Sequence, residues 1–397
     1  MRETAGDEWK VLTSEAGQAL LAEVAGVALA GPADIARWRR GYPTGWPAAA
    51  LRLVEARRKG PGKFERADRM WLDPVGVEQA TAEVVARHKA RRFGEGGVVV
   101  DLCSGIGGDA IALASANRVI AVDLDAGMTR RGTWNAGVHG VADRLMVVRA
   151  RAEAFPIPTG ARVHVDPDRR AAGRGRARAK AVADYAPGVD FLRGLPARVP
   201  GGAIKLGPSS DFLAHFGGPG FELEVVSLGG ECKEVTAWFG DLADPRVRRR
   251  ATALPQGATW TDRDGASGQA RAPGSVEGWV FDPDPALIRS GLLDGFAASR
   301  GLARIAAGVD LLTGPSRDDS PFLAAFEVVE LFPLDLKILR REVAERGLGP
   351  LEIKTRGLET SPEDYRERLR PPGPNPATLI LIAGRSGPSR AILARRP

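Results

Sequence analysis

Asp101 ends a short apolar run and is followed by a cluster of glycines, a combination that can bind a small ligand. The run 98–102 is apolar except for Asp101, which is typical of a strand buried on both faces. Glycines in 105–108 allow a sharp turn, and the apolar run 110–114 then predicts a helix. The order strand, glycine turn, helix predicts a ligand at the carboxyl end of the strand.

The place of Asp101 before the glycines indicates which ligand this is. Dinucleotide-binding turns carry G-x-G-x-x-G at the same point, whereas this chain has D-x-x-x-G-x-G-G. A carboxylate there would repel a pyrophosphate but suits a ligand that carries an ammonium and a sulfonium group as well as a carboxylate. S-adenosylmethionine fits this description. The alternative is a buried strand and packing turn without a cofactor.

The stretch 101–109 resembles motif I of the class I S-adenosylmethionine-dependent methyltransferases, and 119–125 resembles their second strand, which ends in a ribose-binding acid. The stretch 135–144 is similar to a segment of their RNA-directed branch, which includes trimethylguanosine synthase. The resemblance implies cofactor contacts from Asp101, Cys103, Gly105, Gly107, Asp109, Asp123 and Leu124. Near the adenine, Arg151 stands where an acid is common, and Glu153 is the expected substitute.

The strand predicted over 163–165 leads into Asp166-Pro167. By resemblance, this is where family members that methylate amino nitrogens carry [D/N/S]-P-P-[F/Y/W]. Asp168-Arg169 replaces the last two positions, so stacking on a base would come from Tyr185 or Trp71, or would not occur. In-line methyl transfer needs an aligned nucleophile and, for a protonated one, a proton acceptor. We predict that Asp166 is this base or orienting acceptor; the alternative is an acid that caps the next turn.

Two segments are candidates for substrate binding. Residues 169–180 carry six cations and no acid, which predicts a flexible loop whose arginines, beginning with Arg169 and Arg170, contact phosphates. A solvated loop is the alternative. By resemblance, five residues of the mixed loop before the core form one wall of the site, namely Lys63, Arg66, Asp68, Met70 and Trp71. The alternative is a linker from the helical cap.

The order of predicted elements indicates an α/β fold. Residues 93–243 alternate strand and helix as in a Rossmann-like doubly wound sheet, closed by a hairpin over 222–239. Residues 1–92 have helical spacing and form an N-terminal cap, and the period of 74–93 predicts one helix. Residues 244–277 are rich in Gly, Pro, Arg and Asp and predict a linker or hairpin. Residues 278–397 read as a small α+β domain.

This last domain resembles the THUMP-like domain of bacterial methyltransferases in the runs 280–285, 332–337 and 351–357. THUMP domains proper bind RNA, so the resemblance implies an RNA-presenting role for its cations, namely Lys337, Lys354 and Arg356. A dimerising or stabilising domain is the alternative.

Composition limits the class of protein. The 397 residues carry a formal charge of +7, which favours an anionic partner, although arginine-rich chains are often basic through genome composition alone. No apolar run approaches the ~20 residues of a membrane span, and no secretory signal is visible. The two cysteines form no disulfide framework or metal cluster, so we expect a reducing cytoplasm and no metal. Cys232 reads as a hairpin connector rather than a nucleophile.

We therefore expect a cytoplasmic, S-adenosylmethionine-dependent methyltransferase that acts on RNA. A methyltransferase acting on protein or a small molecule is one alternative. The other is a nucleic-acid-binding protein with a degenerate core, which is favoured by the replacement of family motif residues at Asp168-Arg169 and Arg151. The methylated atom and the oligomeric state stay open.

Overall fold

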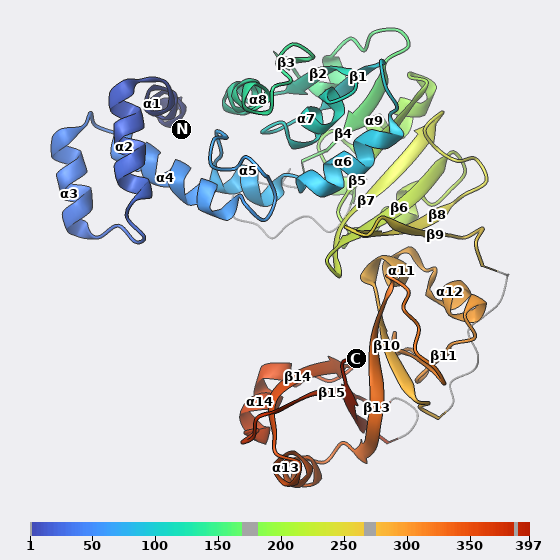
Figure 1. Cartoon of the computed structure of the whole chain (residues 1–397). Helices are drawn as coiled ribbons and strands as arrows, with labels where there is room; N and C mark the ends of the chain where they lie inside the picture. Colours follow the sequence, from blue (N-terminus) through green and yellow to red (C-terminus); the bar gives the residue numbers. More distant parts are fainter. Residues whose placement is uncertain (1, 169–181, 266–274, 385–387) are drawn as a thin grey trace. The chain divides into compact units, whose positions relative to one another are not determined.

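The computed structural model describes residues 2–168, 182–265, 275–384 and 388–397. The chain forms two compact units (Figure 1). The first comprises Met1–Glu222 and Val235–Pro245, and the second comprises Leu223–Glu234 and Arg246–Pro397.

The first unit begins with the helices that the spacing of 1–92 predicts. They are α1 (Arg2–Thr13), α2 (Glu15–Ala25), α3 (Pro32–Gly41), α4 (Trp46–Lys59), α5 (Pro74–Gln79) and α6 (Glu83–Arg92). The sequence predicts one helix over 74–93, but the structure has two. Ala80 and Ala82 have extended backbone, which ends α5 and precedes α6. This break places Thr81 beside the N-terminus of α7 (Gly108–Ala114), where the Thr81 hydroxyl donates to Asp109.

The sheet of the first unit has the strand order β3-β2-β1-β4-β5-β7. The strands are β1 (Val98–Leu102), β2 (Arg118–Asp123), β3 (Leu145–Arg149), β4 (Arg162–Val165), β5 (Gly201–Leu206) and β7 (Glu231–Gly240). The first five are parallel, and β7 runs antiparallel to β5. The predicted fold class, a doubly wound sheet with one reversed strand, is confirmed. The connecting helices are α7 (Gly108–Ala114), α8 (Ala126–His139), α9 (Val189–Gly194) and α10 (Phe212–Phe216).

Strand β1 is central, since it pairs with β2 on one side and β4 on the other. Four of its five residues are buried, which explains its nearly continuous apolar run. Its only carboxylate, Asp101, lies opposite His164 in the register with β4. The carboxyl ends of β1, β2 and β4 therefore meet at one edge of the sheet.

The second unit contains β6 (Phe221–Leu228), which pairs in parallel with β8 (Arg249–Leu254). The hairpin expected within 244–277 is formed by β8 and β9 (Ala258–Thr261), which are antiparallel. A further sheet has the order β11-β12-β10-β13-β16-β15-β14. Its strands are β10 (Trp279–Pro283), β11 (Ala303–Arg304), β12 (Leu312–Gly314), β13 (Leu323–Pro333), β14 (Leu348–Arg356), β15 (Asn375–Ile382) and β16 (Arg390–Arg395).

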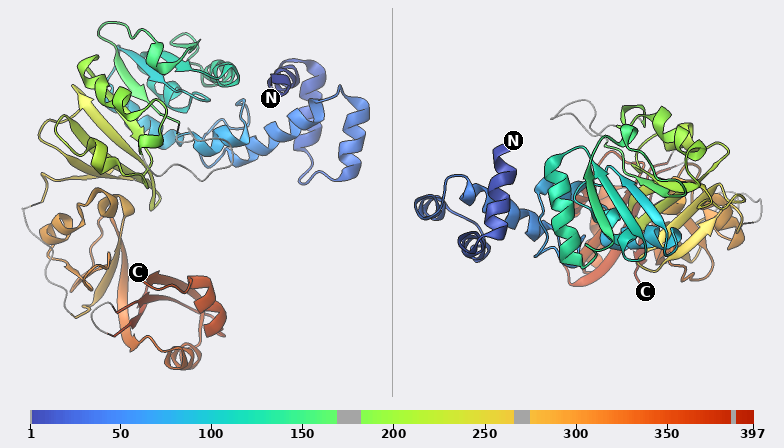
Figure 2. Two further views of the ribbon diagram at one scale, coloured as in Figure 1. Left: turned by 180° about the vertical axis from the view of Figure 1, so that it is seen from behind. Right: turned by 90° about the horizontal axis from the view of Figure 1, so that it is seen from above.

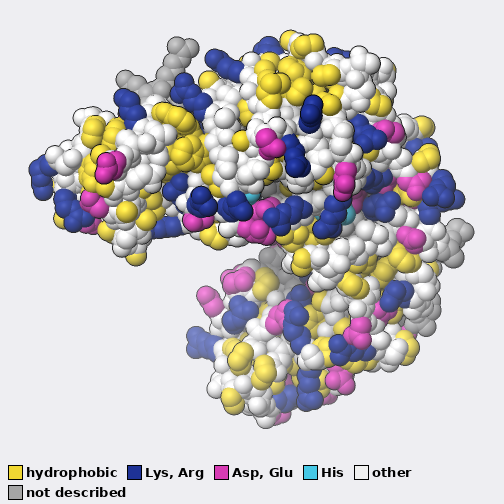
Figure 3. Space-filling model, turned by 45° about the horizontal axis from the view of Figure 1, so that its top comes forward, with side chains coloured by type: hydrophobic (Ala, Val, Ile, Leu, Met, Phe, Trp, Pro, Cys, Tyr) yellow, Lys and Arg dark blue, Asp and Glu magenta, His cyan; other side chains and the backbone are white. Residues whose placement is uncertain are grey.

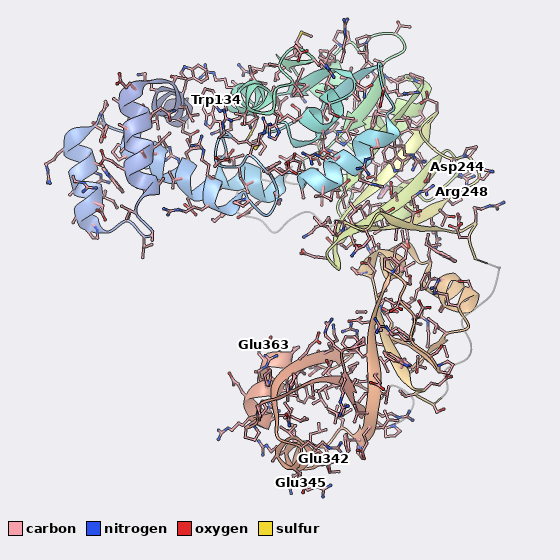
Figure 4. The ribbon with its side chains drawn as sticks, in the orientation of Figure 1. Trp134, Asp244, Arg248, Glu342, Glu345 and Glu363 are labelled. Atoms are coloured by element: carbon pink, nitrogen blue, oxygen red, sulfur yellow. The ribbon has the colours of Figure 1, made fainter. Side chains whose placement is uncertain are left out.

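The helices of the second unit are α11 (Pro285–Ser290), α12 (Leu293–Ser299), α13 (Leu336–Glu345) and α14 (Pro362–Leu369). Leu339 of α13 and Tyr365 of α14 share one apolar cluster with β14 and β15, so both helices cover one face of these strands (Figure 2). Figure 4 labels acidic residues Glu342 and Glu345 on α13 and Glu363 on α14. Within the described residues, none of these or the other helices has the length and apolarity that a membrane span requires.

Candidate active site

Three acidic side chains lie at the carboxyl edge of the first unit's sheet, at the ends of three strands. They are Asp101 on β1, Asp123 on β2 and Asp166 directly after β4. The backbone N–H of Asp166 donates to the carbonyl of Leu102 at 3.1 Å, so β4 continues beside β1 up to this acid. The structure thus brings together the three acids that the sequence assigns to the amino, ribose and nucleophile positions.

The turn after β1 has a backbone that mostly suits glycine. Gly105 and Gly107 have φ values of 55° and 92°, and Cys103 adopts φ 62° despite its side chain. A Cβ built on Gly105 meets no atom within 4 Å, so the turn presents bare backbone to open space there. Burial raises the pKa of the Cys103 thiol well above its usual range, so this residue is a neutral part of the turn and not a nucleophile.

Asp123 is oriented by two backbone N–H groups. Its Oδ2 accepts from Gly105 at 2.8 Å and its Oδ1 from Asp125 at 2.9 Å. Burial raises the pKa of Asp123, and these two hydrogen bonds oppose the effect. The carboxylate is held against the glycine turn before any ligand arrives.

Asp101 and His164 form a buried pair. His164 Nδ1 lies 2.6 Å from Asp101 Oδ1, and both side chains are at most 1% exposed. Burial raises the pKa of Asp101, while the neighbouring His164 acts in the opposite direction. Among the residues that the structure describes, Asp101 Oδ2 and His164 Nε2 have no hydrogen-bond partner. One oxygen of the predicted cofactor contact is therefore buried without a donor.

Asp109 lies at the start of α7, in a buried ion pair with Lys89 at 3.0 Å. Its Oδ2 accepts from the Thr81 hydroxyl at 2.6 Å. Burial opposes ionisation of Asp109, but Lys89, with smaller contributions from His164, Lys205 and the Thr81 hydrogen bond, outweighs it and lowers the pKa. The sequence predicts that Asp109 contacts the cofactor; in the structure its carboxylate ties α6 to α7, and any cofactor contact stays a prediction.

Asp166 is paired with a residue that the sequence analysis did not identify. Lys205 Nζ on β5 donates to Asp166 Oδ2 at 2.5 Å. Lys205 is buried, whereas the Asp166 side chain is 29% exposed. Pro167 is buried, and Asp168 exchanges two backbone hydrogen bonds with Ala186. The one sequence signal for Lys205 is a single cation within the apolar run 203–206.

The two aromatic candidates for base stacking are both buried. The indole N–H of Trp71 donates to Glu8 at 3.0 Å, and the Tyr185 hydroxyl accepts from the backbone N–H of Gly207 at 3.0 Å. Neither ring presents a face to solvent, which favours a packing role. Trp71 instead joins an aromatic group with Trp9 and Trp134, the latter labelled on α8 in Figure 4.

The remaining predicted residues lie as follows. Lys63 donates to the carbonyls of Glu78 and Ala80, and Arg66 donates to that of Val138, so both also fasten the loop to its neighbours. Asp68 is exposed and Met70 is buried. Leu124 is exposed, and Glu153 is exposed beside Arg151 at 3.8 Å. Arg169 and Arg170, with the whole cationic loop 169–180, lie outside the described residues.

In the second unit, two of the three predicted RNA-presenting cations form ion pairs with the same acid. Lys354 and Arg356 both donate to Asp282, at 2.9 and 2.6 Å, whereas Lys337 is exposed. Over the face seen in Figure 3, basic and acidic side chains are interspersed. Among the described residues, no group of three or more His, Cys, Asp or Glu side chains is arranged to hold a metal ion.

Comparisons with known proteins agree with this geometry. The family described as RNA cap guanine-N2 methyltransferase matches residues 96–166, and the family described as THUMP domain-like matches residues 323–396. Two curated relatives from Mycobacterium tuberculosis, strains CDC 1551 and H37Rv, are named as uncharacterized S-adenosylmethionine-dependent methyltransferases. Each is 34% identical over 320 residues, 78% of this chain and 84% of the relative. A solved structure from Porphyromonas gingivalis W83, named as a candidate methyltransferase, covers 95% of this chain and 97% of its own at 21% identity and a TM-score of 0.74, which shows a shared fold.

Proposed function

We propose that this chain, which belongs to the S-adenosylmethionine-dependent methyltransferases, transfers the methyl group to RNA. The observation that carries the substrate is the match of residues 96–166 to a family whose members are described as acting on the guanine of an RNA cap. The THUMP-like C-terminal region supports the same substrate. The net charge of +7 suits a polyanion.

The residues at the sheet edge fit the cofactor. The unpartnered Asp101 Oδ2 would accept from the methionyl ammonium group, directly or through water. The bare backbone at Gly105 would admit the amino-acid portion, and Asp123, already oriented beside it, would accept from the ribose hydroxyls. When bound, S-adenosylmethionine supplies an electrophilic methyl group on its sulfonium.

Asp166 would align the nucleophile. Lys205 holds one of its oxygens, which leaves Oδ1 to accept a hydrogen bond from an amino nitrogen of the substrate. This hydrogen bond orients the nitrogen for in-line displacement, and the carboxylate can take its proton as the new bond forms. The partial exposure of Asp166 gives the substrate a route to this oxygen.

The test is transfer of radiolabelled methyl groups to separated RNA and protein fractions from cells that lack this gene. We expect wild-type protein to label RNA and Asp166→Ala to abolish the label. Glu95→Ala, a change at an exposed acid before the amino end of β1, is the matched control and should leave labelling intact. Label in protein alone would replace RNA as the substrate.

The second candidate is a nucleic-acid-binding protein without turnover. It is favoured by one observation, the replacement of the proline-aromatic pair by Asp168-Arg169. Calorimetric binding of S-adenosylhomocysteine combined with no label in any fraction would support this candidate over an active enzyme.

A further inference from the structure

Three acid–base pairs lie side by side beneath the proposed cofactor site. Asp109 pairs with Lys89 at 3.0 Å, Asp101 with His164 at 2.6 Å and Asp166 with Lys205 at 2.5 Å. The β-sheet register explains the proximity of the last two pairs. His164 lies opposite Asp101 on one side and Ala203 on the other, and Asp166 and Lys205 are each two residues further along their strands. All four side chains therefore point to the same face.

The formal charges of the six groups do not sum to zero if His164 is neutral. Asp101, Asp109 and Asp166 supply three negative charges, whereas Lys89 and Lys205 supply two positive ones. An uncompensated charge among buried groups is costly, so the pair of Asp101 and His164 should retain one additional proton in the free protein. Since the two groups share a short contact, this proton belongs to the pair rather than to either residue.

Among the described residues, the groups that act most strongly on Asp101 offer no further positive charge. They are His164, Asp109 and Asp166, and burial keeps the adjacent Cys103 thiol neutral. Asp109 and Asp166 each already have a lysine partner. Burial of Asp101 raises its pKa, which agrees with a retained proton on the pair.

We infer that binding of the cofactor's amino-acid end displaces this proton from the Asp101–His164 pair to solvent. The incoming ammonium group, placed at Asp101 Oδ2, brings the positive charge that the proton had supplied. Counted with the ligand's ammonium group but without its carboxylate, the cluster is neutral before and after binding, with three carboxylates against two lysines and either one proton or one ammonium. The inference rests on the proposed function only in placing the ammonium group at Asp101.

The linkage predicts a measurable pH dependence of cofactor affinity. Because binding favours the deprotonated pair, affinity should rise with pH, by up to about tenfold per pH unit, and become constant once the free pair has lost its proton. The ligand's own ammonium titration, measured without protein, is subtracted. Affinity that is independent of pH from about pH 5.5 to 8, the range in which histidine ordinarily titrates, would overturn the inference.

The direct experiment is titration calorimetry near pH 6 in two buffers of different ionisation enthalpy. S-adenosylhomocysteine, which keeps the ammonium group, should release close to one proton per molecule bound. 5′-Methylthioadenosine, which lacks the amino-acid end, should release none. Absence of release with S-adenosylhomocysteine, or equal release with both ligands, would overturn the inference. Failure of S-adenosylhomocysteine to bind would instead refute the proposed cofactor site.

Asp101→Asn isolates the pair. Without this carboxylate, the two negative charges of the remaining acids cancel the two positive charges of the lysines, so the cluster needs no additional proton. We expect no proton release and weaker binding of S-adenosylhomocysteine, by roughly 10- to 100-fold, with 5′-methylthioadenosine affinity retained as evidence of folding. Glu95→Gln is the matched surface control and should release protons as the wild type does. Undiminished release from Asp101→Asn would contradict the assignment.

Discussion

Replacing Lys205 by Met should slow methyl transfer at saturating S-adenosylmethionine. The change keeps an unbranched side chain in β5 but removes the ammonium group that lies 2.5 Å from Asp166 Oδ2. Asp166 then loses the hydrogen bond that fixes its orientation at the proposed nucleophile site. The partners of Asp101 and Asp123 are untouched, because His164, Gly105 and Asp125 hold those acids.

The expected size of the effect follows from the strength of this hydrogen bond. A hydrogen bond between charged groups is worth about 1.5–3 kcal/mol, and the 29% exposure of Asp166 lets water replace part of it. A decrease of about 1.5–2 kcal/mol in transition-state stabilisation corresponds to a roughly 10- to 30-fold slower reaction.

The assay is the initial rate of labelled methyl transfer, at saturating S-adenosylmethionine, into whichever fraction the wild type labels. Calorimetry with S-adenosylhomocysteine reports cofactor binding separately. Lys59→Met is the matched control: Lys59 pairs with Glu55 at 2.8 Å, but both side chains are exposed, so the change should leave the rate unchanged. A Lys205→Met rate within about threefold of the wild type, with binding intact, would refute the role of Lys205.

Three further changes test the turn, the cap and the second unit. Gly107→Val places a side chain at φ 92°, where non-glycine residues are strained by about 1–2 kcal/mol or more, so calorimetry should detect no S-adenosylhomocysteine binding; wild-type affinity would contradict the proposed turn. Glu8→Gln leaves the charge of Arg131 buried without its 2.6 Å partner and should destabilise the first unit by about 3 kcal/mol in urea, where the same change at an exposed glutamate should have almost no effect. The ion pair with Arg396 lowers the pKa of Glu352 to about 2, so its stabilisation is present above the ordinary pKa near 4.5 and is lost as pH falls towards 2. Calorimetric melting at pH 5 and pH 2 should therefore show a smaller difference for Glu352→Gln than for the wild type, and equal differences would exclude this contribution.

The parts of the site that the sequence predicts are those with local signals. Asp101, Asp123 and Asp166 each end a recognisable apolar run, so their common place at the sheet edge follows from parallel topology alone. The glycine turn is equally local, because positive φ values favour glycine at 105 and 107. The same reasoning explains why the strands predicted over 98–102 and 163–165 lie within one residue of β1 and β4.

The residues that the sequence did not identify depend on long-range register. His164 meets Asp101 across 63 positions and Lys205 meets Asp166 across 39, so neither pair leaves a local pattern. The break of the predicted 74–93 helix has a similar origin, since Thr81 between α5 and α6 contacts Asp109 in α7. Trp71 has a long-range contact of the same kind: its stacking on a base stays a prediction, whereas its buried indole N–H donates to Glu8, 63 positions away.

Each proposed contact of the site is itself held by a second group before any ligand binds. His164 holds Asp101, the Gly105 backbone holds Asp123, and Lys205 holds Asp166. Such preorganisation lowers the cost of ordering the site when cofactor and nucleophile arrive. In the proposed mechanism, the first two acids contact the cofactor and the third contacts the nucleophile. Changes to His164 should therefore alter cofactor affinity and its pH dependence, whereas changes to Lys205 should slow turnover even when the cofactor is saturating.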